Sequence, residues 1–141
     1  ALLSFGYALL QKHIESTVQR VGLDPYVGCL HALEPARPSL VLDLMEEFRP
    51  LVVDYAMLDL VLGGKLTAPE FTFTGRSERP VEIGERLLPR VVEAYAARTE
   101  DVVAHKSSAT QQRLRACYEL QVRAYARVIA GDQPEFAGVL A

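Results

Sequence analysis

Three acidic side chains stand close together in an otherwise apolar stretch, where their carboxylates could do chemistry. Asp43, Glu46 and Glu47 lie within "PSLVLDLMEEFRP", residues 38–50, among Leu, Val, Met and Phe. In a helix, residues three and four positions apart share a face, so these carboxylates are expected to cluster. Burying a carboxylate is costly unless it is paired or bound to a metal. The pattern therefore indicates that these acids have a partner.

A divalent metal ion is one candidate partner. Carboxylate oxygens suit hard Mg²⁺, and one imidazole makes Mn²⁺ acceptable as well. The nearest imidazole in the preceding sequence is His31, in "GCLH" at residues 28–31. Two protein ligands are few, so a third is expected from elsewhere, with waters and phosphate oxygens completing the shell. A site of this composition suits phosphodiester chemistry.

Arginine is the other candidate partner. Arg37 and Arg49 stand close enough in the sequence to neutralise the acids, and Glu47 in particular is consistent with a surface charge. A single histidine such as His31 is also more often structural than a ligand. The residues alone leave the metal and the structural interpretations open.

The elements that must position these residues are helical. Residues 2–21 carry apolar side chains at spacings of three and four, which predicts an amphipathic helix that ends at Gly22. Residues 38–62 form the longest apolar run, which Gly63 and Gly64 end. Pro50 falls inside this run and removes a backbone donor, so we expect a kink or break between residues 48 and 51.

The second half of the chain returns to helical spacing after an interruption. Residues 65–83 are the least helical, because "FTFT" and "VEI" flank "GRSERP". Helices are predicted at 84–104 and 109–130, and the tail 132–141 is expected to be loosely ordered. The predicted fold class is all-α: a compact domain of four or five helices with a short irregular or β-hairpin excursion near 65–83.

Composition narrows the class of protein further. The 141 residues suit one domain, and 23% charged residues with a net charge of −3 are typical of a soluble globular protein. This mild acidity argues against a uniformly basic nucleic-acid-binding surface but permits a local basic patch. Arg123 and Arg127 share a helical face and are candidate DNA contacts, although a solvated face explains them equally well. His105 and Lys106 are expected at a helix end, where capping is favoured over phosphate contact for Lys106.

Several other classes are disfavoured. Cys29 and Cys117 are far apart and form neither a disulfide framework nor a zinc knuckle, which favours a reduced, intracellular compartment. No stretch approaches the roughly 18 unbroken apolar residues of a membrane-spanning helix. There is no G-x-S-x-G elbow and no P-loop. Tyr7, Tyr118 and Tyr125 are expected to be core aromatics.

Three blocks of the sequence together resemble a known family. They are "ALLSFGYALL" at residues 1–10, "GLDPYVGCLH" at 22–31 and "RPSLVLDLMEEFRPLVVD" at 37–54. Their order and spacing are similar to the helical catalytic domain of the CRISPR-associated integrase of spacer acquisition, the "Cas one" family. The resemblance is strong over residues 1–62 and continues more weakly to about residue 130.

The resemblance implies a metal-dependent DNA integrase and endonuclease of adaptive antiviral defence. Such a protein joins the 3′-hydroxyl ends of captured foreign DNA, the protospacer, to a CRISPR repeat by transesterification. The implied cofactor is Mg²⁺ or Mn²⁺. The implied partners are DNA, a second copy in a homodimer and a small nuclease-like CRISPR-associated dimer, in the cytoplasm and without a membrane.

The same resemblance assigns roles to individual residues. His31 and Glu46 match the metal ligands of the family, and Asp43 matches a neighbouring acid that supports the site; all three are candidate catalytic residues. The family's first glutamate has no counterpart here. Residues 1–141 are therefore expected to lack an upstream N-terminal β domain and the first part of the helical domain, and to catalyse little alone.

Two alternative functions remain open at this stage. One is a non-catalytic assembly or dimerisation module, in which the acids only pair with arginines. The other is an all-α metal phosphohydrolase that acts on nucleotides or RNA and needs no DNA ends.

Overall fold

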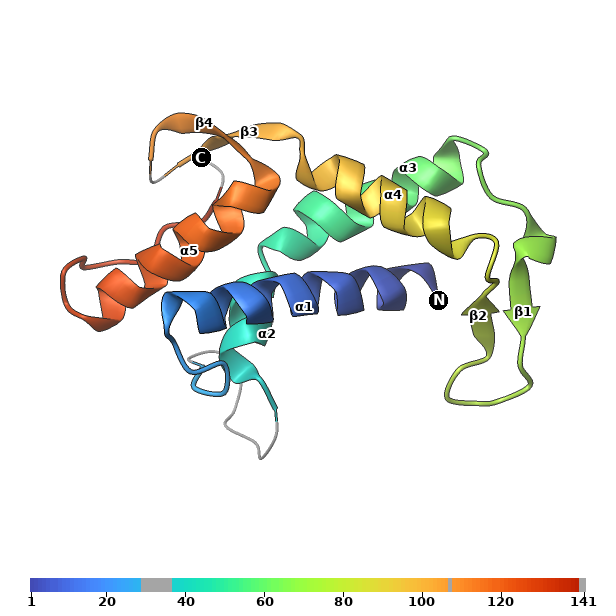
Figure 1. Cartoon of the computed structure of the whole chain (residues 1–141), viewed down its shortest axis with the longest axis horizontal. Helices are drawn as coiled ribbons and strands as arrows, with labels where there is room; N and C mark the ends of the chain where they lie inside the picture. Colours follow the sequence, from blue (N-terminus) through green and yellow to red (C-terminus); the bar gives the residue numbers. More distant parts are fainter. Residues whose placement is uncertain (29–36, 107, 140–141) are drawn as a thin grey trace.

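The longest helix, α1 (Leu2–Val21), crosses the middle of the molecule and packs against α2 and α5 (Figure 1). The structure is a computed structural model that describes residues 1–28, 37–106 and 108–139. The helix buries Leu10, Ile14 and Val18 on one face, as its apolar spacing predicts. It ends at Gly22, whose φ of 94° is the left-handed conformation that glycine adopts without strain. The predicted bounds of this helix are confirmed.

The apolar run that follows is divided into three pieces. Helix α2 (Ser39–Met45) is followed by a π-helical turn, η1 (Arg49–Asp54), and then by α3 (Tyr55–Leu62). Pro50 is the second residue of η1, where it cannot donate a backbone hydrogen bond and its ring crowds the carbonyl of Glu46. The predicted break is confirmed, and it leaves Glu46 just outside α2.

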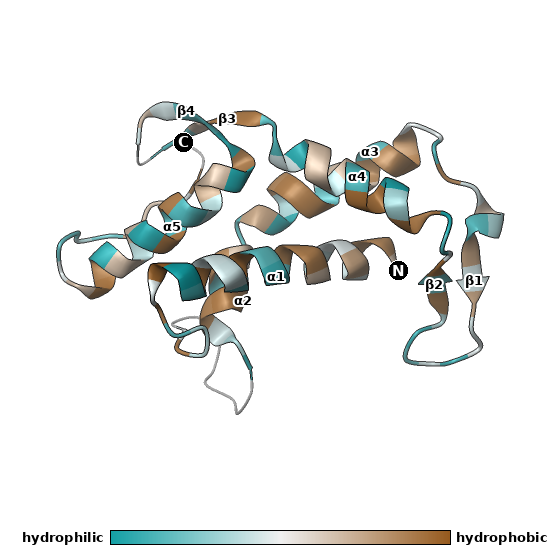
Figure 2. Ribbon diagram, viewed as in Figure 1, coloured by the Kyte–Doolittle hydropathy of each residue, from teal (hydrophilic) through white to brown (hydrophobic). Residues whose placement is uncertain are grey.

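The core lies where the helices meet. Figure 2 shows hydrophobic residues gathered along the facing sides of α1, α2 and α3. Gly6 of α1 allows an especially close contact, because a Cβ at this position would lie 2.5 Å from Cγ1 of Val53 in η1. Fully buried side chains from α1, α2, η1, α4 and α5 and from the turns beside them fill the core: Leu10, Ile14, Val18, Leu40, Val41, Phe48, Val52, Val53, Leu87, Val91, Leu114 and Val122.

A first β-hairpin projects at one end of the molecule (Figure 1). A short 3₁₀ turn, η2 (Ala68–Glu70), leads into β1 (Phe71–Phe73), which pairs antiparallel with β2 (Val81–Ile83). Phe71 stands opposite Ile83, so that both half-buried side chains pack on the core. This is the excursion predicted near residues 65–83, with the β-hairpin rather than the irregular form.

A second hairpin corrects the predictions for the last two helices. Helix α4 spans only Leu88–Thr99, and α5 spans Leu114–Ile129. Between them, β3 (Val102–His105) pairs antiparallel with β4 (Thr110–Arg113). The amide of Leu114 donates to the carbonyl of Asp101 at 2.9 Å and closes the base of this hairpin. The predicted helices 84–104 and 109–130 were therefore each too long by one strand and a few turn residues.

The described residues thus form a mainly α-helical domain of five α-helices with two short hairpins, which confirms the predicted fold class. No helix among them is long and apolar enough to cross a membrane.

Candidate functional site

Glu46 lies at the surface, in the turn between α2 and η1. Its side chain is 44% exposed, and its Oε1 lies 2.8 Å from Nη1 of Arg49. The guanidinium of Arg49 also sits 5.2 Å from the ring centroid of Tyr7 on α1. The structural interpretation in which Arg49 pairs with one of the acids is confirmed for Glu46. An exposed pair of this kind is weak, so Glu46 remains able to exchange Arg49 for another cation.

Asp43 lies one helical turn before Glu46 and is half-buried in α2. A Cβ added at Gly28 would lie 2.7 Å from Oδ2 of Asp43 and 2.6 Å from the carbonyl carbon of Ser39. The carboxylate of Asp43 therefore lies against Gly28, where only glycine allows so close an approach. His31 itself lies outside the described residues, and its predicted pairing with Glu46 remains a prediction.

Glu47 points away from the surface and corrects the prediction of a single acidic stripe. Its Oε1 accepts a hydrogen bond from Nε2 of Gln121 at 2.9 Å, and its Oε2 accepts one from the amide of Val139 at 2.9 Å. Burial raises the pKa of the Glu47 carboxyl, and these two hydrogen bonds partly offset the rise. Both oxygens accept hydrogen bonds from protein donors, so Glu47 is not simply a surface charge.

The partners of Glu47 belong to a buried polar network. Gln121 on α5 is fully buried; its Oε1 lies 3.3 Å from Nε2 of His105, and its Nε2 also donates to the carbonyl of Ala137 at 3.0 Å. His105 is 2% exposed and sits on β3, so its predicted place at a helix end was wrong. The amide of Lys106 donates to the carbonyl of Val139 at 2.9 Å.

The prediction of a loosely ordered tail is therefore corrected for residues 137–139, where Val139 is only 2% exposed. Its described end is held by hydrogen bonds from three separate parts of the chain.

Tyr7 extends the site onto α1. Its hydroxyl donates to Oδ1 of Asp54 at 2.6 Å. This hydrogen bond is the main reason why the pKa of Tyr7 is raised; burial and the negative charges of Asp54 and Glu46 add to the effect, and Arg49 opposes it. The prediction that Tyr7 is simply a core aromatic missed this contact. The only sequence signal is its position in the block "ALLSFGYALL".

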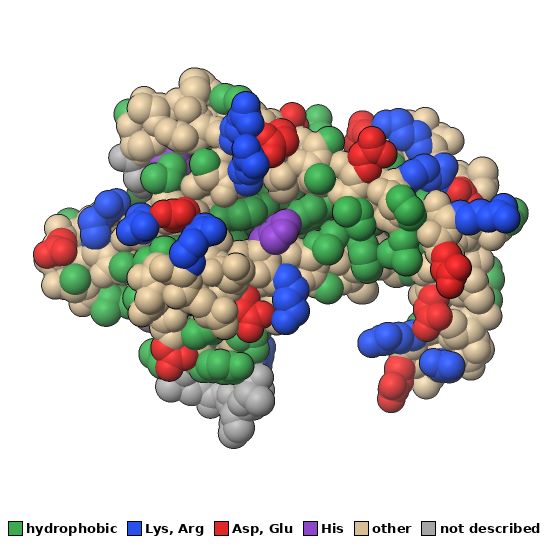
Figure 3. Space-filling model, viewed as in Figure 1, with side chains coloured by type: hydrophobic (Ala, Val, Ile, Leu, Met, Phe, Trp, Pro, Cys, Tyr) green, Lys and Arg blue, Asp and Glu red, His purple; other side chains and the backbone are tan. Residues whose placement is uncertain are grey.

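The candidate DNA-contacting residues fall into two groups. Arg123 is exposed on α5 and lines a hollow of about 270 Å³ together with Arg20 and Arg115. Arg20 and Arg123 both pair with Glu119, at 3.2 and 2.8 Å. Figure 3 shows Lys and Arg side chains interspersed with acids over α5.

The other two candidates lie outside this hollow. Arg127 stands one turn further along α5, and its Nε donates to Oε1 of Gln133 at 3.4 Å. Lys106 is exposed where β3 ends. The structure thus groups Arg123 with Arg20 and Arg115, which the sequence reasoning had not assigned to DNA.

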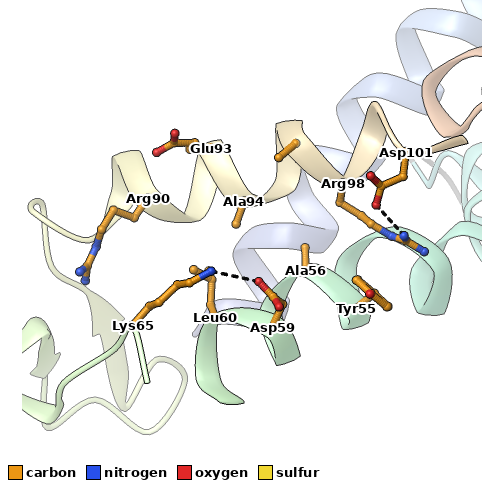
Figure 4. A pocket seen from close by; sticks show the side chains of 11 residues that line it. Tyr55, Ala56, Asp59, Leu60, Lys65, Arg90, Glu93, Ala94, Arg98 and Asp101 are labelled. Atoms are coloured by element: carbon orange, nitrogen blue, oxygen red, sulfur yellow. Dashed lines mark hydrogen bonds and ion pairs between the residues drawn. The ribbon is translucent and has the colours of Figure 1, made fainter. Parts of the chain in front are cut away.

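A larger hollow, of about 610 Å³, lies between α3 and α4 (Figure 4). Its charges are mostly paired: Lys65 contacts Asp59 at 3.2 Å, and Arg98 contacts Asp101 at 2.7 Å while its guanidinium lies 3.8 Å from the ring centroid of Tyr55. None of the predicted site residues that the structure describes lines this hollow.

Cys117 is the described cysteine, and it is fully buried on α5. Burial raises the pKa of its thiol to about 11, so the thiol stays protonated at neutral pH and is a poor nucleophile. Cys29 lies outside the described residues, and the expected intracellular compartment remains a prediction.

The described acids fit part of a site for a divalent cation. Asp43 and Glu46 offer carboxylate oxygens, the ligands that Mg²⁺ and Mn²⁺ prefer. Within residues 1–28, 37–106 and 108–139, no three His, Cys, Asp or Glu side chains form a group that could hold a metal. The described part of the chain therefore supplies an incomplete ligand set, to which His31 would be the natural addition.

Comparison with known proteins shows the family to which this mainly helical domain belongs. The profile of the family "CRISPR associated protein Cas1" matches residues 1–97. The chain belongs to this family, as its three sequence blocks predicted.

Relatives match over nearly the whole chain. The "CRISPR-associated endonuclease Cas1 1" of Moorella thermoacetica is 38% identical over 136 residues, which are 96% of this chain and 39% of the relative. The "CRISPR-associated endonuclease Cas1 3" of Thermus thermophilus is 34% identical, over 96% of this chain and 40% of the relative. The chain thus spans about two fifths of the length of these relatives.

Solved structures also match over nearly the whole chain. A Cas1 protein from Thermotoga maritima superposes with a TM-score of 0.83 at 27% identity, covering 94% of this chain and 40% of the other. A "Casposase bound to integration product" superposes with a TM-score of 0.85 at 25% identity, covering 96% of this chain and 36% of the other.

Proposed function

We propose that this chain is part of the catalytic domain of a DNA integrase and endonuclease that joins captured foreign DNA to a CRISPR repeat. The observation that carries the proposal is a pair of acids inside the family-matched region: half-buried Asp43 in α2 and, one helical turn later, exposed Glu46 in the turn after α2. Relatives named as endonucleases and a similar casposase bound to an integration product support the activity and the substrate.

Three residues, Glu46, His31 and Asp43, would each have a role in this reaction. Glu46, with His31, would hold Mg²⁺ or Mn²⁺. Asp43 would orient His31 by contacting that ligand rather than the metal ion. When bound, the cation polarises the scissile phosphate and lowers the pKa of the attacking hydroxyl. The 3′-hydroxyl of the incoming DNA gives up its proton as its oxygen bonds to phosphorus, the repeat's own P–O bond breaks, and the released 3′-oxygen of the repeat takes up a proton.

The DNA would run across the arginines of α5. Arg20 on α1 and Arg115 and Arg123 on α5 line one hollow with the acid Glu119, and Arg115 also pairs with Glu100 at 3.0 Å. The lining of the hollow still carries an excess of positive charge. Phosphate oxygens can replace the exposed carboxylate as partners of these arginines. Arg127 and Lys106 would extend the path.

The proposed assembly contains a second copy of the chain and a small nuclease-like dimer. One similar solved structure is a "Partial Cas6-RT-Cas1--Cas2 complex", with a TM-score of 0.79 at 21% identity, which supports a common fold. The partner dimer of the present protein would correspond to the Cas2 component of that complex.

The decisive experiment is DNA joining by the gene-length protein with its partner. Labelled DNA with free 3′-hydroxyl ends is incubated with a supercoiled plasmid that carries the repeat, with and without Mg²⁺ or Mn²⁺. Glu46→Ala and His31→Ala are expected to abolish transfer of the label while their thermal unfolding stays close to that of the wild type. Asp59→Ala is the matched control, because Asp59 is also an exposed acid in a surface ion pair.

Three results would contradict the proposal. Transfer by Glu46→Ala at the wild-type rate would show that this carboxylate takes no part in the reaction. A folded wild-type complex that binds its partner but transfers no label would favour the assembly module, and hydrolysis of small phosphoesters without DNA ends would favour the phosphohydrolase.

A further inference from the structure

Two neighbouring glutamates in one turn point in opposite directions. Glu46 is exposed beside Arg49, whereas Glu47 is turned into the protein toward α5 and the tail. Successive residues of a helical turn are about 100° apart, which allows one side chain to face solvent while the next faces the interior. Any movement of Glu47 is therefore transmitted through one peptide unit to Glu46.

The turn lies between two helical elements, and its backbone stays helical at Glu46, where φ is −54° and ψ is −43°. Helix α2 ends at Met45, and the π-helical turn begins only at Arg49. Phe48 anchors the turn through its ring, which meets the ring of Tyr118 edge-on at 4.8 Å between centroids. This apolar contact keeps the turn close to α5 but does not set how the turn is rotated. Hydrogen bonds can set that rotation, because they are directional.

Glu47 supplies the directional contact, and its partners are themselves fixed. Each of its two oxygens accepts one donor at 2.9 Å, from Gln121 and from the amide of Val139. Gln121 is fully buried and further bonded to Ala137 and His105. Gly138 passes so close that a Cβ there would lie 3.2 Å from Oε2 of Glu47.

We propose that Glu47, Gln121 and the backbone of Val139 form a clamp that sets the position of Glu46, so that Glu47 is a positioning residue for the metal-dependent reaction. The inference rests on the proposed function, because it takes Glu46 to be a metal ligand. Supporting contacts behind a metal ligand typically change metal affinity or activity by about 10- to 100-fold when they are lost. The clamp also links the candidate metal ligand to the described end of the chain.

The test is metal affinity, measured on the gene-length protein. Mn²⁺ is titrated and the free ion is followed by electron paramagnetic resonance, and hydrogen exchange is measured at residues 46–49 and 137–139. In Glu47→Gln, the new amide NH₂ group faces a protein donor, so one hydrogen bond is lost. This variant is expected to bind Mn²⁺ about tenfold more weakly and to exchange faster in both segments.

Two further variants separate positioning from simple damage. The double exchange Glu47→Gln with Gln121→Glu reverses the Glu–Gln pair but removes the donor to the carbonyl of Ala137, so it is expected to restore only part of the Mn²⁺ affinity. Gly138→Ala crowds Oε2 of Glu47 gently and is expected to weaken Mn²⁺ binding to a smaller extent, which keeps the proposal testable if Glu47→Gln does not fold. Glu82→Gln, on the exposed side of β2, is the control that should change nothing.

Unchanged Mn²⁺ affinity in Glu47→Gln, together with faster exchange only at residues 137–139, would overturn the clamp and leave Glu47 as an anchor for the tail. A wild-type protein that binds no Mn²⁺ would overturn it as well. A wild-type protein that binds Mn²⁺ but joins no DNA would instead overturn the proposed function, while the titration would still judge the clamp.

Discussion

The close contact between α1 and η1 at Gly6 predicts the sign of the stability change caused by Gly6→Ala. Gly6 lies in the interior of α1, where alanine is normally the better residue by about 1 kcal/mol. The contact with Val53 reverses this expectation, because the new Cβ would lie 2.5 Å from Cγ1 of that side chain. Val53 is fully buried and β-branched, so it has little freedom to rotate away.

The magnitude follows from these two opposing effects. Overpacking a filled core costs about 1–3 kcal/mol, so Gly6→Ala should lower the free energy of unfolding by about 1 kcal/mol net. Val53→Ala alone should cost about 2 kcal/mol through lost burial and a small cavity. In the double variant the offending methyl is gone, and the two Cβ atoms would meet at 3.6 Å, an ordinary contact.

The assay is a double-mutant cycle on the purified domain, by urea unfolding followed by circular dichroism. In the Val53→Ala background, Gly6→Ala should raise the free energy of unfolding by about 1 kcal/mol, which gives a coupling of about 2 kcal/mol. Ala8→Gly on the exposed side of α1 is the control for helix propensity alone. Stabilisation by Gly6→Ala in the wild-type background, or additive effects, would refute the packing described for α1 and η1.

Two further predictions concern Tyr7 and Arg123. The hydrogen bond to Asp54 raises the pKa of Tyr7 in the folded state, so the stability it confers is complete below the ordinary tyrosine pKa and is lost as the pH rises through that value toward the folded pKa. Tyr7→Phe should therefore flatten the loss of stability above about pH 10, measured by urea unfolding at a series of pH values, and an unchanged profile would contradict this. Arg123→Ala should weaken DNA binding by the gene-length protein and reduce the slope of log affinity against log salt by about 1, measured by fluorescence anisotropy. Arg76, which is exposed in the turn between β1 and β2 and does not line the hollow, is the control position, and an equal loss of affinity in Arg76→Ala would contradict a DNA path over α5.

Local pattern was sufficient to predict the first half of the fold. The amphipathic spacing of residues 2–21 and the glycine after it define α1 without help from the rest of the chain. Pro50 marks the break because its effect on a helix is intrinsic to its ring.

The second half shows where local pattern fails. Residues 102–105, "VVAH", continue an apolar pattern that suits a helix or a strand equally well. These residues form a strand because they pair with residues 110–113 and because His105 contacts Gln121. "KSSA" at the tip was the available turn signal, and Ala109 there adopts a φ of 52°.

The candidate site divides in the same way. The proximity of Asp43 and Glu46 could be predicted from their spacing alone, since they lie three residues apart in a helical segment. The role of Glu47 could not, because its partners Gln121 and Val139 are 74 and 92 positions away in the sequence. A long-range hydrogen bond leaves no periodicity for a sequence to display.

The two adjacent glutamates explain why an oily segment carries so many acids. A carboxylate at the surface, such as Glu46, keeps its charge at little cost and can bind a cation, whereas the buried Glu47 is costly and must be compensated by donors. A segment that was only a core helix would gain nothing from either. Because both acids lie in the turn before Pro50, Glu46 stays at the surface while Glu47 ties that turn to α5 through Gln121.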